Sequence, residues 1–248
     1  MTSPRISRAL VVALATALAA GTLGCGLLEQ AKGIADAAAV VSEFADRLGK
    51  AQNLTYTAEY SLTGDNGEKT TATFVQQPPN AAFVGKEGSF IFTPEALFFC
   101  GTAKGETTCQ KSPNNATKVD AGDNAYIGAA MGAGFVTPEL AIGVILAAGF
   151  VPGAKIEQSD ETIAGLDTKC ATASGLEAAA SPGDKSAPKD FKVCVTEDGV
   201  LAAFTGTTTE GVEASIQLTN YSTSADAKAF APPAGAKIVD TSVIQPGQ

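Results

Sequence analysis

The sequence predicts an α+β fold: a strongly curved antiparallel half-barrel sheet of about eleven strands, with helices covering the concave face. Apolar residues recur every three or four positions from Leu27 to Leu48, as on one side of an amphipathic helix. After Asn53 the apolar period becomes two, in short segments joined by turns, as in strands. A long antiparallel sheet twists and curls, so helices are expected to fill its concave side.

The N-terminal segment has the parts of a secretory signal peptide. Arg5 and Arg8 precede an apolar run, residues 9–20, which is too short to span a bilayer. Thr22-Leu23-Gly24-Cys25 then resembles the lipobox of bacterial lipoproteins, in which the cysteine carries a diacylglyceryl group; a plain signal peptide that contains a cysteine is the alternative. We expect cleavage after residue 24, a membrane tether over residues 25–33, and a location outside the cytoplasm, on the outer face of the bacterial cell membrane.

The remaining chain is expected to be one acidic domain, residues 25–248. Removing residues 1–24 of 248 leaves 224, and removing Arg5 and Arg8 leaves 15 of the 17 basic residues against 26 acidic ones. Nucleic acid and anionic lipid headgroups are poor partners for such a surface as a whole, because both would be repelled at long range. The chain has no histidine and no phosphate-binding or nucleophile motif in a suitable context, so we expect neither an enzyme nor a cofactor. The paired carboxylates Asp160-Glu161 and Glu197-Asp198 fall at strand ends or turns, where solvated charges are expected.

Four cysteines remain after Cys25, an even number in an exported chain, which predicts two disulfides. Three connectivities are possible, and we favour the local pairs Cys100–Cys109 and Cys170–Cys194, because each pair falls in strands expected to be neighbours. Metal binding is the competing hypothesis, but the spacing is not C-x-x-C and no histidine is present.

The elements follow in order from these periods. After the first helix, Tyr56 and Tyr60 share an apolar face with Leu54, Ala58 and Leu62 of the first strand. Packing of the helix on its own domain is favoured over a coiled coil, because its apolar stripe is rich in alanine. The expected strands cover 54–62, 68–76, 81–85, 89–93, 96–100, 107–111, 154–163, 168–174, 191–196, 200–207 and 212–222, followed by a Pro/Gly-rich ending and a short strand at 238–239.

A second helix interrupts the strands. Thr137, Pro138 and Gly149 suit its N-cap, its first position and its end, so the sequence predicts a helix over 138–148. Its residues are apolar on every side, which predicts a helix buried all round. A membrane span is the alternative, but Pro138, Glu139 and several glycines interrupt the apolar run.

The order of these motifs resembles the LolA-like superfamily, in particular its LppX and LprG type. The resemblance rests on the lipobox cysteine, the first helix, the strand pair 54–76, the helix after Thr137, the hairpin at 197–200 and the ending 230–236. It implies a half-barrel whose hydrophobic cavity carries the acyl chains of a lipid or glycolipid. The two cysteine pairs depart from the pattern of many members.

The residues expected to line such a cavity are mainly phenylalanines near the Gly/Ala-rich helix. They are Phe74, Phe83, Phe90, Phe92, Phe98, Phe135, Ile142 and Leu146. The same side chains would equally fill a solid core, because the pattern does not separate filled from hollow. Two hypotheses follow: a lipid-binding or lipid-transfer lipoprotein, and a non-enzymatic scaffold, adhesion or sensor-partner module that binds an envelope protein and no lipid.

Overall fold

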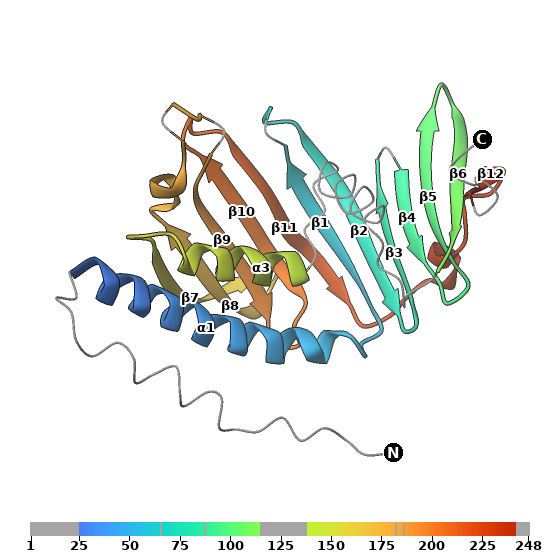
Figure 1. Cartoon of the computed structure of the whole chain (residues 1–248). Helices are drawn as coiled ribbons and strands as arrows, with labels where there is room; N and C mark the ends of the chain where they lie inside the picture. Colours follow the sequence, from blue (N-terminus) through green and yellow to red (C-terminus); the bar gives the residue numbers. More distant parts are fainter. Residues whose placement is uncertain are drawn as a thin grey trace, which may run out of the picture.

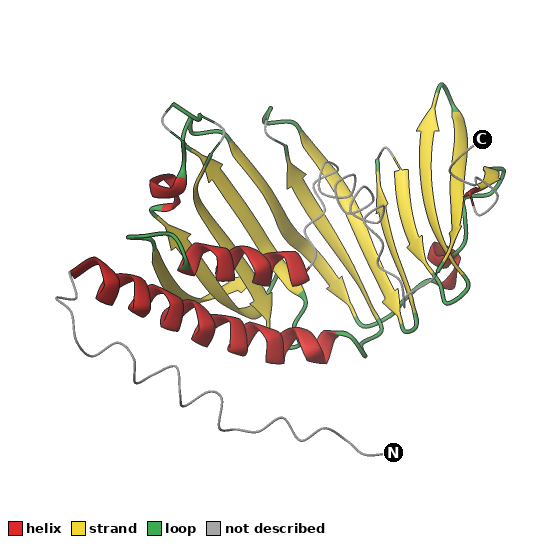
Figure 2. Ribbon diagram, in the orientation of Figure 1, coloured by secondary structure: helices red, strands yellow, loops and turns green. Residues whose placement is uncertain are grey.

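The fold is one twelve-stranded curved sheet with two long helices on its concave face (Figure 1, Figure 2). It is seen in a computed structural model, which describes residues 25–64, 66–86, 88–114, 138–181, 183–185 and 187–241. The helices are α1 (Cys25–Ala51), α3 (Pro138–Gly149) and the short 3-10 turns η1 (Leu176–Ala179) and η2 (Ala227–Phe230). The predicted α+β half-barrel is therefore confirmed. The expected signal peptide, residues 1–24, lies outside the described residues.

The strands match the predicted segments closely. They are β1 (Tyr56–Thr63), β2 (Lys69–Gln77), β3 (Asn80–Gly85), β4 (Gly88–Phe92), β5 (Ala96–Ala103), β6 (Glu106–Pro113), β7 (Lys155–Ile163), β8 (Leu166–Ser174), β9 (Pro188–Thr196), β10 (Leu201–Thr208), β11 (Glu213–Ser222) and β12 (Lys237–Asp240). β1 alternates as expected, with Tyr56, Ala58, Tyr60 and Leu62 buried. β2 ends at Gln77, directly before Pro78-Pro79, because proline has no N–H for the ladder.

The strand order differs from a simple meander. The sheet runs β12-β6-β5-β4-β3-β2-β1-β11-β10-β9-β8-β7, so two meanders meet where β1 pairs with β11, with Leu62 opposite Ile216. β6 and β7, neighbours in the chain, lie near opposite edges, and β12 pairs parallel with β6. Strands joined by short turns pair antiparallel, as expected, but the β1–β11 and β6–β12 pairings depart from a meander, because turn signals specify only local pairings.

The main core lies between the sheet and the two helices. α1 directs Ala37, Val40 and Phe44 inward, and α3 directs Ile145 and Ala148 inward. The helices pack against each other; α1 also contacts β7 and β9, and α3 contacts β7 and β8. α1 begins at Cys25, so the backbone of the expected tether is helical.

The prediction that α3 is buried on all sides was wrong. Leu146 keeps 40% of its surface exposed, and Gly143 and Ala147 are also exposed. Only one side of α3 packs against the core, because α1 and the sheet contact that side and leave the other side exposed.

A second, smaller core lies on the opposite face of the sheet. Ala82, Ile91, Cys100 and Cys109 form it together with Phe98, Ala229, Phe230 and Ala236. The last three residues belong to the ending that follows β11, so the predicted Pro/Gly-rich segment crosses this face before it forms β12. Within the described part of the chain, no helix has both the length and the apolar character needed to cross a membrane.

Candidate functional site

A row of phenylalanines crosses four neighbouring strands on one face of the sheet. Phe74 of β2 lies opposite Phe83 of β3, Phe83 opposite Phe90 of β4, and Phe90 opposite Phe99 of β5. Residues paired across antiparallel strands share a face, so the four side chains form one line, named here the aromatic row. The ring centroids of Phe90 and Phe99 are 4.7 Å apart, and those of Tyr56 and Phe74 are 5.6 Å apart.

The aromatic row lies on the face that carries the helices. Phe83 is buried in the main core, which also holds Phe44 of α1, and Phe74 and Phe90 pack against that core. α1 and α3 contact β7, β8 and β9, at the other end of the strand order from β3 to β5. Figure 1 shows the two helices over the half of the sheet that contains β7 to β11. The aromatic row therefore begins beside the helix layer and continues away from it.

The predicted lining residues divide into three groups. Phe74, Phe83 and Phe90 lie together in the aromatic row, and Phe92 follows Phe90 on the same face with 40% of its surface exposed. Phe98 does not join them, because it pairs with Ile91 and packs in the smaller core on the opposite face. Leu146 is on the exposed side of α3. Phe135 and the side chain of Ile142 lie outside the described residues.

Two aromatic residues of this face were not among the predicted lining residues. Phe99 completes the aromatic row, and Tyr56 extends it into β1. Phe98 and Phe99 are adjacent, so one of them must face each side of β5, and only the β4–β5 register decides which. Tyr56 was predicted on the buried face of its strand. The β1–β2 hairpin sets it beside Phe74, and the long-range β1–β11 pairing, which has no local signal, sets it beside Tyr221.

Polar groups on this face are used for structure. The Tyr60 hydroxyl donates a hydrogen bond to the Leu201 carbonyl at 2.9 Å, where the β9–β10 register shifts. Burial, followed by the charges of Tyr56 and Tyr221, raises the pKa of Tyr60 well above its usual value. Across the described residues, each buried side-chain nitrogen or oxygen has a hydrogen-bond partner. The face therefore offers apolar contact to a ligand, and the hydroxyl of its buried Tyr60 is already paired.

Both disulfides form as the sequence predicts. Cys100 pairs with Cys109 and Cys170 with Cys194, each across adjacent strands and each fully buried. Such bonds persist in oxidising compartments, which agrees with an extracytoplasmic location.

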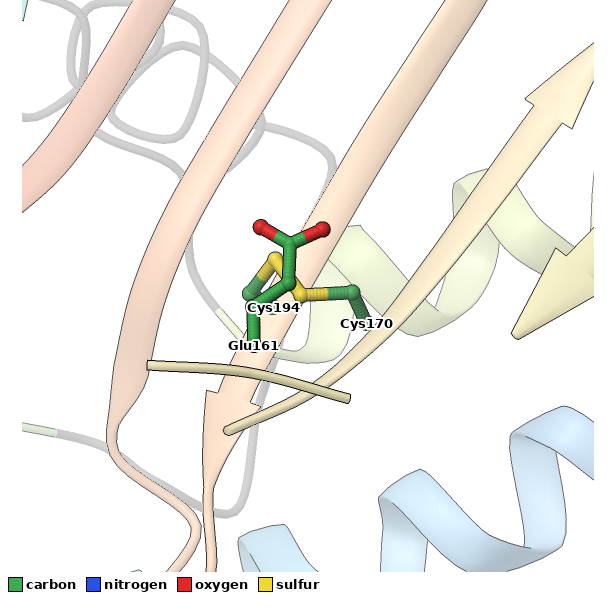
Figure 3. Close-up of side chains that lie close together, drawn as sticks. All are labelled: Glu161, Cys170 and Cys194. Atoms are coloured by element: carbon green, nitrogen blue, oxygen red, sulfur yellow. A yellow bond between two sulfur atoms is a disulfide. The ribbon is translucent and has the colours of Figure 1, made fainter. Parts of the chain in front are cut away.

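The convex face carries a cluster that has the residue types of a metal site. The ligand atoms of Glu161, Cys170 and Cys194 lie within 4.8 Å of one another (Figure 3). Both sulfurs are in one disulfide, so neither is a thiolate, and Glu161 is paired with Lys192. Beside them is a shallow hollow of about 300 Å³, lined mainly by polar residues such as Thr205, Ser215 and Gln217. Asp160 pairs with Lys169 at 2.9 Å, and Glu197-Asp198 form the turn after β9. Asp160, Glu197 and Asp198 are exposed, as expected of solvated charges.

No protein-family model matches this sequence, and no curated protein matches it either. Solved structures do show a similar arrangement. An uncharacterized conserved protein from Thermus thermophilus aligns at 11% identity and TM-score 0.48, covering 81% of this chain and 99% of that protein. MucB aligns at 13% identity and TM-score 0.43, covering 81% of this chain and 66% of MucB; it has also been solved in complex with MucA from Pseudomonas aeruginosa.

The lipoprotein LppX of Mycobacterium tuberculosis is also among these structures. It aligns at 13% identity and TM-score 0.39, covering 74% of this chain and 95% of LppX. LppX, the type that the sequence resembles, is thus among the solved structures that this chain is similar to.

Proposed function

We propose that this protein is an envelope lipoprotein, anchored through a lipid on Cys25, that binds or transfers the acyl chains of a lipid on the concave face of its sheet. The aromatic row carries the proposal. Four phenylalanines in register across β2 to β5 give a continuous apolar track about 14 Å long, from a strand spacing of ~4.8 Å. An acyl chain is recognised by such apolar contact and needs no charged partner.

Exposure along this face supports a track that a ligand can reach. Phe83 is buried, Phe74, Phe90 and Phe99 are half-buried, and Phe92 is the most open. A binding track needs a buried end and an end that a ligand can reach from the solvent. The gradient from Phe83 to Phe92 gives it both.

The anchor and the track belong to the same side of the molecule. α1 begins at Cys25 and lies on the concave face, so a lipid on Cys25 would hold this face within one helix length of the bilayer, about 40 Å at 1.5 Å per residue for the 27 residues of α1. Two acyl chains hold a protein durably, because each buried methylene contributes ~0.8 kcal/mol.

A matched pair of variants tests the binding track. Phe92 and Val84 are on neighbouring strands with 40% and 41% of their surfaces exposed, but they point to opposite faces. F92E places a carboxylate on the track and should abolish saturable binding of a fluorescent fatty acid, while V84E should leave binding unchanged. Equal binding by the two folded variants would refute the track.

The anchor has its own test. C25S should move the protein from the membrane fraction to the soluble fraction of the cell, and a variant that stays in the membrane would refute lipidation at Cys25.

A protein-binding module without a ligand is the second candidate. The burial of Phe83 in the main core favours it, because side chains that fill the core leave no space for a ligand. Native mass spectrometry of the mature protein separates the two: co-purified lipid supports the carrier, and a protein that neither carries lipid nor takes up fatty acid supports the module.

A further inference from the structure

The outer side of the helix layer is apolar at one end. At this end of the helix layer, the exposed positions whose side chains the structure describes carry only aliphatic or aromatic residues or glycine. We name them the helical patch: Ile34, Ala35, Ala38 and Ala39 of α1, and Gly143, Leu146, Ala147 and Phe150 of α3 and the turn after it. Phe150 keeps 61% of its surface exposed and Leu146 40%. Residues 143–154 include no charged or polar side chain. A protein surface in contact with water normally interrupts such a stretch with charges.

The two contributing segments lie at the same end of the layer. Lys50, near the end of α1, donates to the carbonyl of Glu197, which follows β9. The end of β9 pairs with the beginning of β8, and the beginning of β8 pairs with the end of β7. The end of β7 is therefore near Lys50, and the start of β7 lies toward the beginning of α1. β7 follows α3 after a five-residue connection, so α3 ends at the end where α1 begins, as Figure 1 shows.

Polarity changes along α1 in the same direction. The exposed described positions Ile34, Ala35, Ala38 and Ala39 lie toward the beginning of α1, and Ser42, Asp46 and Lys50 lie nearer its end. The first half of the helix also carries the charged residues Glu29, Lys32 and Asp36 in its sequence. Ile34 is nine residues from Cys25, about 14 Å along the helix at 1.5 Å per residue. The apolar end of the layer is therefore the end that bears Cys25.

We propose that the helical patch rests on the bilayer surface, with Leu146 and Phe150 inserted at the level of the lipid headgroups. The proposal rests on the lipid anchor at Cys25 given above. An anchor at this end brings the helical patch to the membrane, and apolar residues on the exposed side of a helix enter the interface between headgroups and acyl chains. α3 would then lie between the bilayer and the concave face.

The absence of tryptophan from the chain allows a direct test. We would prepare the lipidated protein carrying F150W, and a control carrying V84W on the opposite face of the sheet, and add each to phosphatidylcholine vesicles with brominated acyl chains. The indole of F150W should be quenched and its emission shifted to the blue, whereas that of V84W should not change. L146W should behave like F150W, which guards against a local effect of one substitution.

The outcomes separate the two proposals. If both variants sediment with the vesicles and F150W is quenched no more than V84W, the protein is anchored and the patch does not touch the membrane, which overturns this inference alone. If neither variant sediments with the vesicles, the anchor fails and this inference fails with it.

Discussion

The Cys170–Cys194 disulfide should stabilise the fold more than the Cys100–Cys109 disulfide. Both are fully buried, so exposure does not distinguish them. They close loops of different length, with sequence separations of 24 and 9. In the chain-entropy model these separations correspond to about 3.4 and about 2.6 kcal/mol of free energy of unfolding.

The assay compares two double variants, C170A/C194A and C100A/C109A, by urea unfolding followed by circular dichroism. We expect both to unfold at lower urea concentration, and C170A/C194A to lose about 0.9 kcal/mol more than C100A/C109A. Alanine is used because serine would bury an unpaired hydroxyl. Equal slopes of the free energy against urea would show that the variants unfold to comparable states.

A larger loss in C100A/C109A would refute the reasoning from loop length. If both variants lost less than about 1 kcal/mol in the free energy of unfolding, the disulfides would not stabilise the fold by restricting the unfolded chain. Adding a reductant to either variant should then affect only the disulfide that remains.

Two further predictions concern the sheet itself. Y60F should lower the free energy of unfolding by about 1–3 kcal/mol, because the buried Leu201 carbonyl loses its donor. The raised pKa of Tyr60 means that the folded state holds the hydroxyl proton more tightly than the unfolded state does. The contribution of Tyr60 to the free energy of unfolding is therefore complete below pH 10, the usual pKa, and falls as the pH rises from there toward the folded pKa. Y60F should flatten this fall in urea unfolding measured between pH 8 and 11. G88A should destabilise the β4–β5 pairing, because an added Cβ would lie 2.1 Å from the Cys100 carbonyl oxygen. G101A is the control in thermal unfolding, because a Cβ at Gly101 would have no atom within 4 Å.

Local patterns accounted for most of the elements. Alternation predicted the buried face of β1 residue by residue, and the stop at Pro78-Pro79 fixed the end of β2. The helix signals placed α3 within one residue of its observed end. The cysteine pairs were predictable because each pair falls in two strands that the sequence places next to each other.

Long-range pairing accounts for what was not predicted. β1 pairs with β11 across most of the chain, and nothing in either strand's own alternation selects the other as its partner. The same limit explains the lining residues. Phe98 and Phe99 are chemically equal, and the β4–β5 register alone places Phe99 in the aromatic row and Phe98 in the smaller core.

The exposure of α3 has a physical meaning that links these results. A helix without a polar face is expected to be buried on all sides, because water penalises exposed apolar surface. In α3 the fold buries Ile145 and Ala148 and leaves Leu146 exposed, with Phe150 directly after the helix. The rule requires an apolar medium around the helix and does not require that medium to be protein. If the second side of α3 faces the bilayer, the helix is buried on both sides, by the core and by lipid, and its sequence has the composition that this position demands.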